Sequence, residues 1–145
     1  MEDDELARAL HGLGLGRDNH QAVVLLPLIE VAWADGRIQR AEKRRLVQIA
    51  RQHGIPVEQA WLDRWLKRRP STHAFLAART VLLALMARGG RPVPALASLD
   101  QLLELCLSVA RSAGGLFGFA SVDRRERECI EQIAASLSLG PALPE

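Results

Sequence analysis

The sequence predicts an all-α protein, a compact bundle of about seven helices. Apolar residues recur at spacings of three and four along nearly the whole chain, which is the period of an amphipathic helix. No segment of four or more residues alternates cleanly between apolar and polar side chains, as a half-buried strand would. With 145 residues, 48% apolar and 25% charged, the composition is typical of a folded globular protein. We therefore expect one helical domain over residues 1–145.

Glycine, proline and capping residues set the expected helix ends in the first half of the chain. Asp18 and Gln21 form a capping-box pair, and Pro27 lies inside the helix that follows, which therefore either kinks there or begins later. Gly54 ends the next helix because it tolerates a left-handed cap, and Ser71 can cap the last one. The expected helices span residues 3–11, 18–34, 39–53, 57–68 and 72–88.

The second half contains two further expected helices. Ser98 with Gln101 forms a capping box that begins a helix running to about residue 113. Asp123 with Glu126 has the same spacing and begins a helix that ends near residue 137. Between the halves, residues 89–92 form the clearest loop, and residues 141–145 form a tail.

The two halves also resemble each other in sequence. Residues 38–42 align with residues 122–126 at an offset of 84, and the apolar positions that follow align as well. Val31-Ala32 matches Val109-Ala110 once six extra residues are allowed in the second turn. We interpret this as a duplication that gives two pseudo-symmetric helical-hairpin halves, about 18–88 and 95–139.

Charge and cysteine content exclude several classes of protein. A net charge of +2 argues against a dedicated nucleic-acid binder. The acidic start is the reverse of a signal peptide, and the longest apolar run, residues 74–87, is interrupted by Arg79 and too short to span a bilayer. We expect a cytoplasmic protein in which Cys106 and Cys129 are small core residues.

The Asp35-Gly36 turn has the second half of a calcium-loop pattern, with Ile38 and Glu42 at the expected spacing. Calcium needs six to eight oxygen ligands, and the earlier ligand positions are occupied by Val31 and Trp33, so an ordinary EF-hand is excluded. Two interpretations remain open. Asp35, Glu42 and Glu30 could bind a divalent cation, calcium or magnesium, together with backbone carbonyls and water. Alternatively, Glu42 caps a helix and Asp35-Gly36 is only a turn, which we favour.

Two other features are candidates for partner binding. The second turn, residues 114–121, carries Phe117 and Phe119, which either pack under the helices or form a docking patch. Arginine-rich runs at residues 43–45, 67–69 and 124–127 are either solvated helix faces or a surface for an acidic protein partner. Arg44 and Arg45 are the candidates on the first run.

No catalytic pattern emerges from the sequence, so we expect no enzyme. The four histidines are scattered without metal-ligand spacing. The glycine-rich segment 12–16 follows a helix rather than a strand and lacks the Gly-Lys-Ser/Thr ending of a phosphate loop.

The Ala-Asp-Gly turn, Ile38, Glu42 and the apolar pattern after them resemble the TerB-like family, associated with tellurite resistance, phage defence and some DnaJ-type co-chaperones. The resemblance covers residues 25–139 and is strongest over 29–54. It implies a bundle of about seven helices and a non-enzymatic role in a stress-response or envelope-associated complex. It also implies that Asp35 and Glu42 are suspected metal ligands. The second half departs from the pattern, because Ala113 stands where the aspartate would be.

We therefore expect a non-catalytic cytoplasmic interaction or scaffold module that docks onto protein partners through the second turn and the arginine faces. A peripheral membrane complex is compatible with this expectation, although a transmembrane segment is not. The alternative is a binder or sensor of divalent ions at the Asp35-Gly36 turn.

Overall fold

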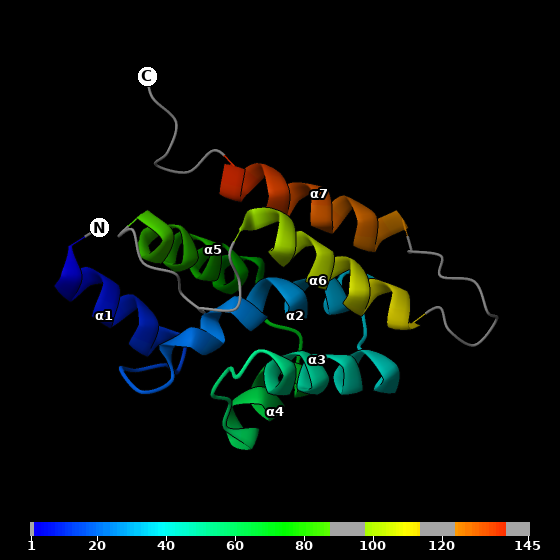
Figure 1. Ribbon diagram of the computed structural model, residues 1–145, viewed down its shortest axis with the longest axis horizontal. Coiled ribbons are helices and arrows are strands. Elements are labelled where there is room, and N and C mark those ends of the chain that lie inside the picture. The colour runs from blue at the N-terminus through cyan, green and yellow to red at the C-terminus, as the bar shows by residue number, and fades with distance from the viewer. Residues whose placement is uncertain (1, 88–97, 114–123, 139–145) are drawn as a thin grey trace.

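A computed structural model describes residues 2–87, 98–113 and 124–138. Within these ranges all regular secondary structure is helical, without strands (Figure 1). This confirms the predicted all-α class. The loop at residues 89–92, the second turn and the tail lie outside the described residues. The elements are α1 (Asp3–Gly12), the 3₁₀ helix η1 (His20–Val24), α2 (Leu25–Trp33), α3 (Arg40–Gln52), α4 (Gln59–Lys67), α5 (Thr72–Ala87), α6 (Leu99–Ala113) and α7 (Arg124–Ser138).

Helix α2 is the centre of the bundle. It runs through the middle of Figure 1 and contacts α3, α5, α6 and α7. Every residue of α2 except Glu30 is buried, and Leu28, Ile29 and Val31 are completely buried. A helix that is apolar on all sides needs this central position, because each exposed face would leave hydrocarbon in water.

The beginning of α2 corrects one sequence-based expectation. The helix does not begin at residue 18: a 3₁₀ helix occupies residues 20–24 and α2 begins at Leu25, so of the two alternatives set by Pro27 the later start is correct. Pro27 is then in the first turn, where its missing N–H leaves no hydrogen bond unmade. Asp18 does not take the expected capping position, since the 3₁₀ helix begins two residues later and its N-cap residue is Asn19. Asn19 Oδ1 instead accepts a hydrogen bond from the Gly16 amide at 2.7 Å.

Most other helix ends follow the predicted capping chemistry. Ser71 Oγ accepts the Ala74 amide at 3.1 Å, and Ser98 Oγ accepts the Gln101 amide at 3.2 Å. Gly54 follows α3 with φ of +63°, a conformation that a side chain would strain. Helix α4 begins at Gln59, two residues later than expected.

The helix contacts form the pattern that a twofold axis relating α2–α3 to α6–α7 would produce. Within the first half α2 contacts α3, and within the second half α6 contacts α7. Between the halves, the α3–α6 contact has its counterpart in the α2–α7 contact, and α2 also packs directly on α6. Helices α4 and α5 lie between the two pairs along the chain, and the described residues after 98 contain only α6 and α7.

Candidate functional site

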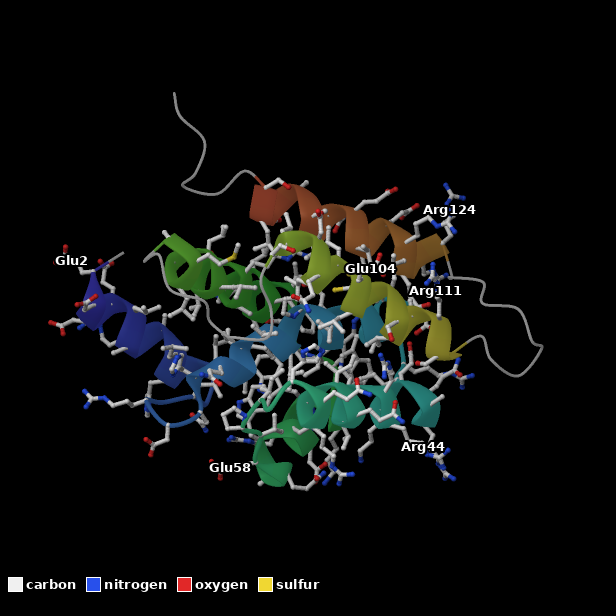
Figure 2. The ribbon with its side chains drawn as sticks, in the orientation of Figure 1. Glu2, Arg44, Glu58, Glu104, Arg111 and Arg124 are labelled. Carbon is white, nitrogen blue, oxygen red and sulfur yellow. The ribbon has the colours of Figure 1, made fainter. Side chains whose placement is uncertain are left out.

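The arginine face of α3 is divided between structure and solvent. Arg44 is exposed (Figure 2). Arg45 is partly buried, because its Nε donates to Ser108 Oγ on α6 and its Nη1 donates to Gln48 Oε1 at 3.1 Å. Arg45 therefore links α3 to α6, which leaves Arg44 as the member of the pair that a partner can reach. The other two predicted partner-binding residues, Phe117 and Phe119, lie outside the described residues.

Glu42 has the capping role that the sequence suggests. Its Oε1 accepts a hydrogen bond from the Gln39 amide at 2.9 Å, and the Gln39 side chain completes the capping box at the start of α3. The Glu42 side chain is nevertheless 0% exposed, which is unusual for a carboxylate, since burying the charged form costs several kcal/mol.

The partner of Glu42 is its repeat counterpart, Glu126 on α7, which is 1% exposed. The two carboxyls lie close enough to interact through a side-chain hydrogen bond, and no N–H group and no Ser or Thr hydroxyl among the described residues donates to Glu42 Oε2. Two carboxyl groups can hydrogen-bond to each other only if one of them carries a proton. A hydrogen bond between these two carboxyls therefore requires one of them to be protonated, as in other close carboxylate pairs.

Burial raises the pKa of Glu42 above its ordinary value, and the negative charge of Asp35 adds to this effect. The hydrogen bonds from Glu126 and from the Gln39 amide oppose the increase only in part. Sequence reasoning identified both glutamates as capping residues but missed their contact. The offset of 84 residues between Glu42 and Glu126 was the available signal, because equivalent residues can meet on a twofold axis.

The three predicted metal ligands have different surroundings. Asp35 is partly exposed and its Oδ1 accepts the Arg37 amide at 3.3 Å, as expected for a turn. Glu30 forms a hydrogen-bonded ion pair with Arg79, which is itself buried. Burial raises the pKa of Glu30, and Arg79 counteracts part of that increase. In the described part of the chain, no three His, Cys, Asp or Glu side chains are grouped so as to hold a metal ion.

The cysteines are core residues, as predicted. Cys106 is completely buried and Cys129 nearly so, and neither forms a disulfide. Burial raises the pKa of both thiols, that of Cys129 to about 12. Since the thiolate is the reactive form, neither thiol is an activated nucleophile.

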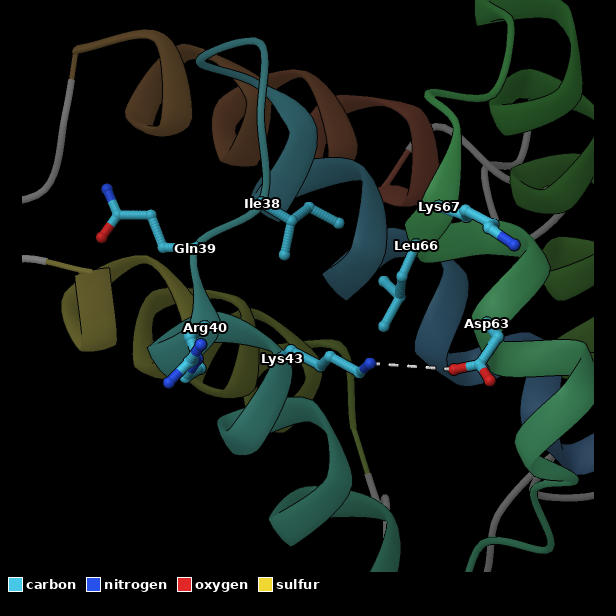
Figure 3. Close-up of a pocket in the computed structure, with 7 residues that line it drawn as sticks. All are labelled: Ile38, Gln39, Arg40, Lys43, Asp63, Leu66 and Lys67. Atoms are coloured by element: carbon cyan, nitrogen blue, oxygen red, sulfur yellow. Dashed lines mark ion pairs between the residues drawn. The ribbon is translucent and has the colours of Figure 1, made fainter.

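A pocket of about 450 Å³ lies between α3 and α4 and is the best candidate for a binding site (Figure 3). Figure 3 shows the apolar side chains of Ile38 and Leu66 in the space between the two helices. The lining of the pocket has three cationic side chains and one carboxylate. The lining residues of this α3–α4 pocket are Ile38, Gln39, Arg40, Lys43, Asp63, Leu66 and Lys67.

The one carboxylate in the α3–α4 pocket accepts a hydrogen bond from Gln59 Nε2 at 2.8 Å, and its ion pair with Lys43 is weak. Lys43 Nζ lies 3.8 Å from Asp63 Oδ1, and the two side chains are 48% and 47% exposed. An ion pair this exposed contributes less than about 1 kcal/mol. Lys43 can therefore exchange Asp63 for a carboxylate of a partner at little cost. The sequence showed the basic runs of Lys43 and Lys67 as separate helix faces, and the packing of α3 against α4 brings them to one pocket.

Comparison with known proteins places this site inside a recognised family region. A family model described as "Protein of unknown function (DUF533)" matches residues 5–84, which include most of α1, all of α2 to α4, most of α5 and the complete lining of the α3–α4 pocket. No curated protein matches the chain, and no solved structure does. Within the described residues, no helix is long and apolar enough to cross a membrane.

Proposed function

Since this chain belongs to the DUF533 family, whose function is unknown, we propose that it is a non-catalytic helical binding module for protein partners. The partner inserts an acidic segment into the α3–α4 pocket. The observation that carries this proposal is the composition of that pocket, in which an apolar floor is surrounded by Arg40, Lys43 and Lys67.

The chemistry of the pocket supports a peptide-like acidic partner. Ile38 and Leu66 are partly buried and can cover one apolar side chain of the partner. The surrounding cations would then pair with carboxylates on either side, which is the usual arrangement of an apolar centre with a polar rim. Rim charges act mainly on the association rate and on partner choice, so we expect binding that weakens as salt is added.

We also propose that the family is TerB-like and that the module works in a cytoplasmic stress-response or envelope-associated assembly. The support is the Ala-Asp-Gly turn with Ile38 and Glu42, all of which lie within the matched residues. A helical fold whose potential nucleophiles are buried thiols is compatible with a scaffold role.

The pocket proposal is tested with a charge reversal and a matched control. Proteins co-purified from the native host identify the partner, and binding of the purified partner is then measured by calorimetry at two salt concentrations. Lys43→Glu with Lys67→Glu should weaken binding at least tenfold at low salt, while Arg8→Glu with Arg51→Glu, which reverses two exposed charges outside the pocket, should have little effect. Equal affinity in all three proteins would remove the pocket from consideration.

The second turn carries a separate docking prediction. The prediction follows the docking interpretation of Phe117 and Phe119, since exposed apolar clusters usually mark interaction sites. Phe117→Ser with Phe119→Ser should leave the helical circular dichroism signal unchanged and abolish partner pull-down. Retained pull-down with retained helicity would contradict a role for this turn.

A second candidate function is binding of a divalent cation at Asp35 and Glu42. The favouring observation is that Glu42 Oε2 is buried without an N–H donor or a Ser or Thr hydroxyl donor among the described residues, close enough to Asp35 for their charges to interact. The described donor set does not fit a complete metal site, because Glu30 is engaged by Arg79. A ligand that binds only the folded state raises the melting temperature. Calcium or magnesium should then raise the melting temperature of the wild type but not that of Asp35→Ala. If millimolar calcium or magnesium leaves the melting temperature of the wild type unchanged, this candidate function is ruled out.

A further inference from the structure

A second pocket, of about 310 Å³, lies on a different face of α4 and is made of unusual components. It combines one tryptophan, three arginines and the glycine turn after α1, and its lining contains no carboxylate. The lining residues of this Trp65 pocket are Gly12, Leu13, Gly14, Arg64, Trp65, Arg68, Arg69, Pro70 and Ala74. On α4, the residues at 63, 66 and 67 line the α3–α4 pocket, whereas those at 64 and 65 line this one.

The wall formed by the glycine turn is fixed in place by α4. Trp61 Nε1 donates to the Leu13 carbonyl at 2.8 Å, which attaches the turn to the helix. Gly14 has φ of +80°, and a β-carbon there would lie 3.0 Å from Trp61 Cδ1 and 3.2 Å from Arg64 Nη2. The turn can approach α4 this closely because residue 14 has no side chain. The geometry of this wall is therefore set before any ligand arrives.

The Trp65 ring is also held in position. Its centroid lies 5.9 Å from that of Trp61 and 6.1 Å from that of Phe75, with tilted ring planes. The Trp65 carbonyl accepts a hydrogen bond from Trp33 Nε1 at 2.9 Å, which fixes the end of α4 against α2. The ring is only partly buried, and it is therefore a preorganised apolar surface that a flat ligand could cover.

The arginines give the pocket its charge. Arg64, Arg68 and Arg69 are all exposed, and in the part of the chain that the structure describes no ion pair engages any of them. The negative end of the α4 dipole favours a cation in its last turn, which accounts for Arg64. Arg68 and Arg69 lie beyond the last residue of the helix, so the dipole alone does not explain why three arginines line the same pocket as Trp65.

We propose that the Trp65 pocket binds a small anion with a flat ring, an aromatic carboxylate or a ring-bearing phosphate monoester such as a nucleoside monophosphate. The ring lies on Trp65, and the acidic group is held by Arg64, Arg68 and Arg69. Guanidinium groups match carboxylate and phosphate oxygens in bidentate geometry. The volume is at the lower end of small-molecule sites, enough for one ring system with its acidic group. This ligand and this surface are separate from the docking of an acidic protein segment at the α3–α4 pocket.

Calorimetric titration with four probes tests the proposal and distinguishes the two sources of the anion. Adenosine monophosphate and phenylpyruvate each carry both a ring and an acidic group, while adenosine lacks the acid and inorganic phosphate lacks the ring. At least one of the two complete probes should bind at a single site, at least tenfold more tightly than adenosine and phosphate. The tighter of the two identifies the anion as phosphate or carboxylate. If neither complete probe exceeds the incomplete ones, the proposal is wrong.

Matched charge removals locate the site. Arg64→Gln with Arg68→Gln should weaken the complete probe at least tenfold, and quenching of tryptophan fluorescence by the probe should fall with it. Arg51→Gln with Arg127→Gln removes the same charge from exposed positions elsewhere and should retain binding. Unchanged affinity in the first variant, or equal losses in both, overturns the assignment. Lys43→Glu with Lys67→Glu leaves the Trp65 pocket intact, so failure of the docking proposal and failure of this one give different results.

Discussion

Replacing Glu42 by glutamine should stabilise the protein at neutral pH, although it changes a completely buried residue. In the wild type both carboxyls are buried, and a hydrogen bond between Glu42 and Glu126 requires a proton on one of them. A glutamine at position 42 keeps an oxygen to accept the Gln39 amide, so the capping box survives. Its amide N–H₂ can donate to Glu126 at any pH. The variant therefore replaces a proton-dependent hydrogen bond with a permanent one.

The size of the expected stabilisation follows from the raised pKa of Glu42. Each unit by which the folded state raises the pKa of Glu42 above its ordinary 4.5 costs about 1.36 kcal/mol of stability at a pH above both values. Glu42→Gln removes this cost but also replaces the original hydrogen bond. We therefore expect the free energy of unfolding to rise by about 1–2 kcal/mol, with an increase in Tm of about 3 °C per kcal/mol for a chain of this size.

The pH dependence has a defined sign. Because the pKa of Glu42 is raised in the folded state, its contribution to stability is fully present below 4.5 and is lost as the pH rises through the raised pKa. The wild type should therefore lose stability over the range above pH 4.5 relative to Glu42→Gln. Glu30 also has a raised pKa, but its effect on stability is the same in the wild type and in Glu42→Gln. It therefore cancels when the free energies of unfolding of the two proteins are subtracted.

The assay is urea denaturation from pH 4 to 8 with a chelator present, so that no divalent ion occupies the carboxyl pair. Glu104→Gln, which changes an exposed carboxyl on α6 (Figure 2), is the control and should alter the free energy of unfolding by less than about 0.5 kcal/mol. A Glu42→Gln protein that is less stable than the wild type at pH 7, with an unchanged pH dependence, would refute the proton-dependent hydrogen bond.

Two further predictions concern stability. Gly14→Ala should lower the free energy of unfolding by about 1–2 kcal/mol, because residue 14 has φ of +80° and a β-carbon would crowd Trp61. The control is Gly12→Ala, since a β-carbon at residue 12 would meet open space. Equal effects of the two substitutions in urea denaturation would contradict the role given to Gly14. Arg79→Met should cost about 3–5 kcal/mol because it leaves Glu30 buried without its counter-charge, and adding Glu30→Gln should restore most of the loss. If the double variant is no more stable than Arg79→Met in the same assay, the ion pair is not the cause.

The helices and most of their ends could be predicted because the responsible interactions are local. Glu42 reaches the Gln39 amide three residues back, and Ser71 and Ser98 each cap an amide three residues ahead. Such contacts depend only on residues that the sequence places side by side. Asp18 is the exception: it begins an equally good pattern, but the chain there forms a 3₁₀ helix instead.

The candidate sites could be predicted only in part, because they join residues that are distant in the chain. The basic run at residues 43–45 was visible, yet nothing in the sequence indicated that Arg45 would be held by Ser108 while Lys43 would share a pocket with Lys67. The Trp65 pocket likewise needs the turn after α1 to pack against α4.

The sequence by itself determined the helical class and the capping of α3 and α5, since periodicity and capping depend on residues that are close together along the chain. The duplication stays an interpretation of the sequence. Only the tertiary structure decided which charges become buried and which face solvent. Glu42 and Glu126 occupy equivalent positions in the sequence, but whether they meet depends on how α3 and α7 pack. Packing is a sum of many weak nonlocal contacts, and no single residue pattern specifies it.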